Sequence, residues 1–214
     1  MRLKINIIFI FLAAQSFVFT QDLSISKTGI QTFYFKDPQN RNQLIFSSDA
    51  IVETFNGVTT DVRGEISFDP ANLQSTLKGE ISTSVKSIKT EIEARDEDLR
   101  SERWLNAEKH PEIIFRIRGV NSVMNLVDNQ IKISVTGDFT CNGRTKTILS
   151  DFTLKYLEES ELTKKRISGD LLSIVGEFEI NLSDFGIRNA FINSRVAENV
   201  VTRVNIVGTN KQSQ

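Results

Sequence analysis

Apolar and polar residues alternate with a period of two along most of the chain, as expected of strands with one buried face. Val62, Ile66 and Phe68 show the pattern, with Arg63 and Glu65 on the opposite face. Similar rows recur throughout the sequence, so we predict an all-β protein with about eight strands. These strands are expected near residues 43–50, 62–68, 77–85, 113–117, 131–139, 152–156, 174–182 and 204–208.

The connections between these rows favour antiparallel neighbours. Asn142-Gly143 is a strong signal for a tight hairpin, and Asp128-Asn129 is a second turn signal. Glycine inside a strand costs stability unless curvature or close packing requires it, so interior glycines predict bent strands that close into a barrel. A two-sheet sandwich stays open as the alternative. The interior glycines are Gly64, Gly79, Gly137 and Gly176.

One segment breaks the alternation. Thr90 and Glu93 match a capping box, and strong helix formers continue to about Leu105. Because proline disfavours helix at the residue before it, the helix should end before His110-Pro111. The apolar stripe of this short helix is narrow, which favours a place across one mouth of the barrel.

The N-terminus resembles a secretory signal. Arg2 and Lys4 precede a short apolar run over residues 5–14, and cleavage is expected after Ser16 or Thr20. An uncleaved anchor is the alternative. We therefore expect an exported protein, periplasmic or secreted, with a cleaved signal peptide over 1–20, an N-terminal segment over 21–42 and the barrel over 43–210.

Charge and cysteine content exclude several classes of function. Removal of the signal segment takes away Arg2 and Lys4. The remaining chain then has 24 of the 26 basic residues and all 27 acidic residues, which gives a net charge of −3. Neither nucleic acid nor an anionic membrane surface is expected as a partner, and no later segment is apolar enough to insert stably into a membrane. The single cysteine, Cys141, cannot form an internal disulfide. It shares the parity of apolar strand residues, so we expect it to be buried and inert rather than paired between molecules.

Candidate catalytic and metal-binding groups are few. His110 is the only histidine, which leaves a Cys141–His110 pair as the one conceivable nucleophilic arrangement. The acidic residues over 91–98 interleave with arginines at helical spacing, as on a solvated, ion-paired helix face. We therefore expect no catalytic residue, no metal site and no enzyme activity.

Phenylalanine is in excess, with fifteen Phe against two Tyr and one Trp. Most Phe residues beyond the N-terminal segment fall on apolar strand faces. Such a row is either a packed core or the lining of a ligand cavity, and the alternation alone does not separate the two.

The helix and its flanks resemble the YceI-like family. The similar segments run through residues 87–90, 95–101, 104–106 and 109–115, and further matches lie at 64–70, 137–146 and 180–187. The resemblance implies an extended, eight-stranded antiparallel lipocalin-like barrel, exported in bacteria and able to form homodimers. It also implies a long apolar cavity for polyisoprenoid or other lipid chains, with no other cofactor.

Two departures from the family pattern concern a headgroup contact. Asp98 stands where the family has histidine in its Arg-Asp-x-His-Leu stretch, and no histidine precedes His110. After the predicted hairpin, Thr147 replaces a proline. The resemblance thus predicts burial of a chain and leaves headgroup contacts open.

The leading hypothesis is therefore an exported carrier for an apolar ligand: a polyisoprenoid, an isoprenoid quinone or a fatty-acyl chain. A ligand-free structural or stress-response module of the cell envelope and a lipid- or quinone-modifying enzyme are the alternatives. The residues expected to line the cavity are Phe46, Phe55, Val62, Ile66, Phe68, Leu77, Ile81, Val85, Leu99, Trp104, Ile113, Phe115, Ile117, Val135, Phe139, Phe152, Phe178, Ile180, Phe185, Val204 and Ile206.

Overall fold

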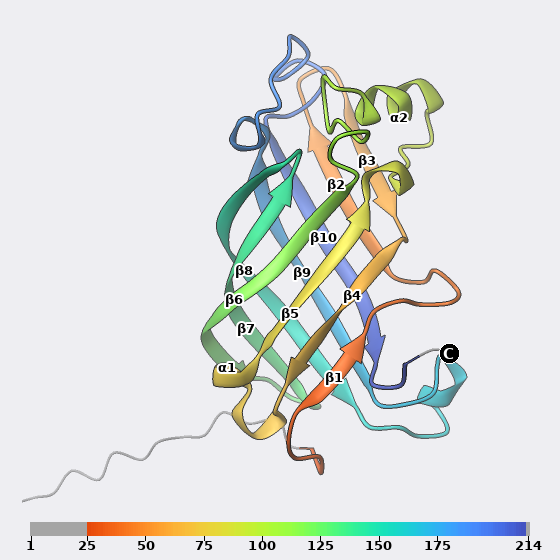
Figure 1. Ribbon diagram of the computed structural model, residues 1–214, viewed down its shortest axis with the longest axis vertical. Coiled ribbons are helices and arrows are strands. Elements are labelled where there is room, and N and C mark those ends of the chain that lie inside the picture. The colour runs from red at the N-terminus through yellow and green to blue at the C-terminus, as the bar shows by residue number, and fades with distance from the viewer. Residues whose placement is uncertain (1–24, 213–214) are drawn as a thin grey trace, which may run out of the picture.

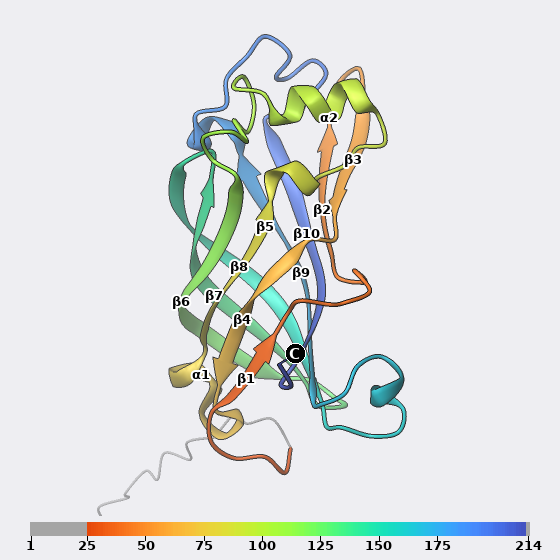
Figure 2. The same ribbon diagram turned by 45° about the vertical axis from the view of Figure 1, so that its right-hand side comes forward.

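A computed structural model describes residues 25–212 (Figures 1 and 2). The predicted signal segment and its cleavage sites lie outside the described residues. The strands are β1 (Gln31–Tyr34), β2 (Gln43–Asp49), β3 (Thr54–Thr59), β4 (Val62–Phe68), β5 (Lys78–Ser84), β6 (Glu112–Asn125), β7 (Gln130–Cys141), β8 (Arg144–Leu157), β9 (Leu171–Asn181) and β10 (Asn199–Thr209). The helices are α1 (Leu73–Thr76), α2 (Glu93–Arg100) and the 3₁₀ turns η1 (Pro70–Asn72), η2 (Val85–Ser87), η3 (Thr163–Lys165) and η4 (Leu182–Phe185).

The ten strands occupy eight positions in one closed antiparallel barrel. From β4 to β10 each strand pairs with the next along the chain. The second edge of β10 then pairs with the N-terminal strands β2 and β1, which closes the barrel. Over residues 201–205 β10 pairs with β2, and at Thr209 it pairs with β1. Because β1 pairs with β4 and β2 with β3, two interrupted strands fill the first two positions. The expected eight-stranded barrel is confirmed.

The interruption of the first strand is held in place by side chains. Asn42 is buried; its Nδ2 donates to the Phe35 carbonyl at 2.8 Å, and its Oδ1 accepts from the Val207 N–H at 2.8 Å. The side chain thus joins the break to β10. Strand β1 lies within the 21–42 segment that the sequence analysis set ahead of the barrel. Four residues are too few to show an alternating pattern, which is why β1 gave no signal.

Two features predicted from turn residues and glycines are present. Asn142 and Gly143 both have positive φ, +48° and +69°, and connect the long strands β7 and β8 as a tight hairpin. Gly64 and Gly79 have φ of +126° and +151°, in the paired strands β4 and β5. A Cβ at Gly64 would collide with the Glu80 carbonyl oxygen. Only glycine allows the two backbones to approach so closely at these φ values.

The two ends of the barrel differ. Near α1, Phe33 stacks on Phe68 with ring centroids 5.8 Å apart and meets Tyr156 edge-on at 5.4 Å. All three side chains are fully buried, so they close this end. The opposite end is crossed by α2 (Figure 2). None of the helices within residues 25–212 has the length and apolar character needed to cross a bilayer.

The helix is shorter than the sequence indicated. It spans Glu93–Arg100, and Ile92 rather than Thr90 is its N-cap residue. Instead of capping the helix end, Thr90 donates from its N–H and its hydroxyl to Asp96 Oδ1, at 2.7 and 2.8 Å. Thr90 is therefore held outside the helix, and the predicted capping box is wrong.

Asp96 is a buried carboxylate at this end, with Lys89 and Arg100 within ion-pair distance. Burial alone would raise its pKa, but the Thr90 hydroxyl and N–H, with Lys89 and Arg100 nearby, hold the pKa of Asp96 below its usual value. A lowered pKa in the folded state means that the stabilisation is present above the unfolded pKa of about 4 and is lost as the pH falls through the folded value.

We therefore predict that Asp96→Asn lowers the free energy of unfolding by about 1–3 kcal/mol at pH 7, and that the difference shrinks in acid. Urea denaturation at pH 7 and near pH 3 measures both. The control is Asp98→Asn, whose exposed pair with Arg103 should contribute below about 1 kcal/mol. Equal losses for both variants at pH 7 would contradict this account.

Candidate ligand-binding cavity

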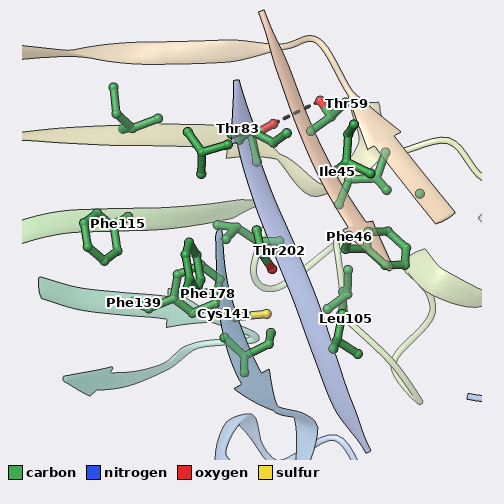
Figure 3. A pocket seen from close by; sticks show the side chains of 18 of the residues that line it. Ile45, Phe46, Thr59, Thr83, Leu105, Phe115, Phe139, Cys141, Phe178 and Thr202 are labelled. Atoms are coloured by element: carbon green, nitrogen blue, oxygen red, sulfur yellow. Dashed lines mark hydrogen bonds between the residues drawn. The ribbon is translucent and has the colours of Figure 1, made fainter. Parts of the chain in front are cut away.

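A cavity of about 420 Å³ lies inside the barrel and reaches the underside of α2. Inward-facing side chains of β2 to β10 form its wall, because residues of one parity on every strand of a closed sheet point inward. Ala94, Arg95, Asp98 and Leu99 of α2 border it at the mouth. Figure 3 shows the side chains from several strands converging on this space.

Seventeen of the residues expected to line a cavity do border it, and they come from strands, from α2 and from connecting segments far apart in the sequence. Their role in holding a ligand stays a prediction. They are Phe46, Phe55, Ile66, Leu77, Ile81, Leu99, Trp104, Ile113, Phe115, Ile117, Val135, Phe139, Phe152, Phe178, Ile180, Val204 and Ile206.

The other four, Val62, Phe68, Val85 and Phe185, are buried but do not line the cavity. Phe68 belongs to the packed end near α1, and Phe185 packs edge-on against Phe139 at 5.4 Å. Alternation predicts which side chains point into the barrel. It does not predict at which level along the barrel axis these side chains pack together and leave no cavity.

Four phenylalanines form an aromatic wall along the cavity. Phe178 stacks on Phe115 at 6.0 Å and meets Phe139 and Phe152 at 5.4 and 6.5 Å. Edge-to-face pairs at such distances are favourable beyond the burial of their area. The excess of phenylalanine thus serves both packing and the lining.

Sequence reasoning missed two groups of lining residues. The first is apolar and shares the parity of the predicted rows. Leu44, Ile133, Leu154, Ile174 and Leu182 lie within the predicted strands but were not included in the expected lining, and extending the last row would have found Val200. The second lies on α2 and in loops at the mouth, where no period exists to follow. It includes Glu53, Arg95, Phe191 and Arg195.

The mouth combines arginines with aromatic rings. Arg95 pairs with Glu53, and its guanidinium carbon lies 4.2 Å from the centroid of the Phe55 ring. Arg195 lies 5.6 Å from the Phe191 centroid, and among the described residues no carboxylate pairs with it. Asp98, at the family's histidine position, pairs with Arg103 at 2.9 Å and faces solvent. The rim is therefore polar while the interior is apolar.

A group of hydroxyls interrupts the apolar wall where β3 approaches β5. Thr59 Oγ1 lies 3.1 Å from Thr83 Oγ1, and both side chains border the cavity (Figure 3). Thr59 Oγ1 also lies 2.7 Å from Ser87 Oγ, which is outside the lining. These residues were not singled out from the sequence, because threonine in a strand row is unremarkable.

Neither the lone histidine nor the lone cysteine forms a reactive arrangement in residues 25–212. No hydrogen bond joins His110 to Cys141, and no three His, Cys, Asp or Glu side chains within these residues gather in metal-binding geometry. Cys141 is buried against the cavity, and burial raises the pKa of its thiol to about 12. A thiol with so high a pKa is a poor nucleophile near neutral pH.

We therefore predict that iodoacetamide labels Cys141 in the folded protein at least about 100-fold more slowly at pH 8 than an exposed cysteine does, since so little thiolate is present. Ser122→Cys, on an exposed stretch of β6, supplies the comparison within the same chain. Mass spectrometry counts the labels over time, and denaturant should remove the difference. Comparable labelling of both cysteines in the folded protein would contradict this account.

Relatives with this sequence pattern are known. A UPF0312 protein of Azotobacter vinelandii is 29% identical over 132 residues, which cover 62% of this chain and 63% of that protein. The alignment thus spans less than two thirds of that curated relative.

Solved structures share the barrel. Burkholderia cenocepacia BcnA has a TM-score of 0.63 at 16% identity, covering 81% of this chain and 100% of that one. A polyisoprenoid binding domain from Saccharophagus degradans, implicated in plant cell wall breakdown, has a TM-score of 0.62 at 10% identity, covering 86% and 99%. Likeness at such identities shows the fold. The sequence profile of the YceI-like domain matches residues 34–208, and the chain therefore belongs to the YceI-like family.

Proposed function

We propose that this protein binds an apolar chain in the barrel cavity and carries or sequesters it outside the cytoplasm. The observation that carries the proposal is the cavity itself: about 420 Å³ of space, bordered along its length by Phe, Ile, Leu and Val. Ligand sites have volumes of this order and mostly apolar linings. A barrel that needed only a core would fill this space with side chains.

Burial of a chain supplies enough free energy for useful affinity. Each methylene contributes about 0.8 kcal/mol, so a dozen buried carbons give roughly 10 kcal/mol. Lost freedom on association removes at least about 4 kcal/mol. The remainder, on the order of 6 kcal/mol, corresponds to a dissociation constant of tens of micromolar, and longer chains bind more tightly.

The ligand class that we propose is a polyisoprenoid, an isoprenoid quinone or a fatty-acyl chain. The Saccharophagus degradans domain with the same fold is described as polyisoprenoid binding, which supports this class. The cationic and apolar N-terminus supports export to the periplasm or beyond. We assign the protein no reaction, because among residues 25–212 no hydrogen bond joins a hydroxyl or the thiol of the cavity wall to a carboxylate or to His110.

Filling the cavity should abolish binding. We predict that Val135→Trp, at a buried position on the lining, weakens the binding of a geranylgeranyl chain at least about tenfold, because the indole occupies the space of the chain. The matched control is Val175→Trp on the outer face of β9, where the side chain is exposed and affinity should be unchanged.

Native mass spectrometry and organic extraction of freshly purified protein show whether a chain is bound, and fluorescence competition gives the affinities. Thermal unfolding checks that each variant is folded. If the unaltered protein holds no lipid and neither prenyl nor fatty-acyl chains bind it, the proposal is wrong, and the barrel acts as a ligand-free module.

A further inference from the structure

The hydroxyls at the junction of β3 and β5 form a chain of hydrogen bonds with a defined direction. Ser87 Oγ lies 2.6 Å from the Ser84 carbonyl oxygen, which can only accept. The Asp61 N–H donates to Thr59 Oγ1 at 3.1 Å. Thr59 Oγ1 lies between Ser87 Oγ at 2.7 Å and Thr83 Oγ1 at 3.1 Å.

Only one assignment of the three hydroxyl protons satisfies all of these contacts. Ser87 donates to the Ser84 carbonyl, because no other hydrogen of the group can. Thr59 then donates to Ser87, and Thr83 donates to Thr59. The reverse direction would leave the Ser84 carbonyl without this bond and the Thr83 proton without a partner. Buried polar groups avoid such losses, which cost about 1–3 kcal/mol each.

This direction of the hydrogen bonds determines how Thr83 can interact with a ligand in the cavity. Thr83 is 3% exposed and borders the cavity, and its proton is already committed to Thr59. No N–H or O–H among residues 25–212 donates to its oxygen in return. With its proton committed, Thr83 Oγ1 can only accept a hydrogen bond from a group that reaches it from the cavity. A hydroxyl oxygen in an apolar wall that can only accept selects a ligand group that donates.

We propose that Thr83 makes this site selective for chains that carry a hydrogen-bond donor, an alcohol, a phenol or an N–H, over chains whose polar group only accepts. The inference rests on the proposed chain-binding function and names the class of ligand within it. Thr83 sets the preference directly, while Ser87, which does not reach the cavity, is a positioning residue that sets the direction of the bonds.

The other hydroxyls on the wall do not impose this preference. Ser48, Ser82 and Thr202 also border the cavity, and within the described residues none of their hydroxyls donates a hydrogen bond, so each can donate or accept. The bordering carboxylates are already ion-paired, Glu53 with Arg95, Glu80 with Arg116 and Asp98 with Arg103. Arg95 and Arg195 are donors, but they lie at the rim near α2 rather than on the wall between β3 and β5. Selection for a donor therefore comes from the Thr83 oxygen.

The test compares geranylgeraniol with its methyl ether, which has the same chain and an oxygen that can only accept. Both are titrated by competition against a fluorescent apolar probe. The alcohol should bind about five- to tenfold more tightly, the effect of one net hydrogen bond. In Thr83→Val the ratio of the two dissociation constants should fall close to one, and Thr83→Ser should keep it.

Ser87→Ala tests whether the preference depends on the direction of the hydrogen bonds or only on the presence of the Thr83 hydroxyl. Without Ser87, Thr59 can donate to Thr83, so the Thr83 proton becomes free to bind an acceptor. The ratio should then fall by several-fold although the lining is unaltered, while Ser122→Ala on exposed β6 should leave it as it was.

An equal or tighter affinity for the ether, or an alcohol preference that survives in Thr83→Val, overturns the inference while chain binding stands. Failure of both probes to bind the unaltered protein overturns the proposed function along with it.

Discussion

The structure depends on the backbone hydrogen bonds that β10 makes along both of its edges. One edge pairs with β9 over the whole strand, and the other is divided between β2 and β1. Asn42 bridges the break between them, with bonds to Phe35 and Val207. An unpaired edge would be a template for association with other chains, so this division keeps the barrel closed even though its first strand is interrupted.

Closure turns one face of every strand inward, but it does not decide whether the inside is filled. At the α1 end, Phe33, Phe68 and Tyr156 pack completely. Toward α2, the aromatic wall around Phe178 leaves space, and a helix rather than a strand covers it. The α2 segment depends in turn on the bonds of Asp96 to Thr90. The result is a barrel that packed side chains close at the α1 end and that has a cavity with a polar rim at the α2 end.

Much of this could be predicted from the sequence. Alternation located the long strands, and Asn142-Gly143 located the hairpin. Gly64 and Gly79 marked positions where the backbone has a conformation that favours glycine. Each of these signals is a local rule. What failed was set by tertiary contacts. Thr90 looks like a helix cap, but Asp96 holds it elsewhere. Phe68 and Phe185 share the inward parity of true lining residues and pack beyond the cavity. The Thr59–Thr83 pair had no sequence signal, because its two residues are brought together only where two strand ends meet.

The claim that the cavity holds an apolar chain is tested most directly by a crystal structure of the protein as purified from its natural host or a bacterial one. The account predicts continuous density for a chain that runs from beneath α2 past Phe178 toward Ile66 and Ile206. A cavity that holds only ordered water, or that side chains have collapsed to fill, would contradict it.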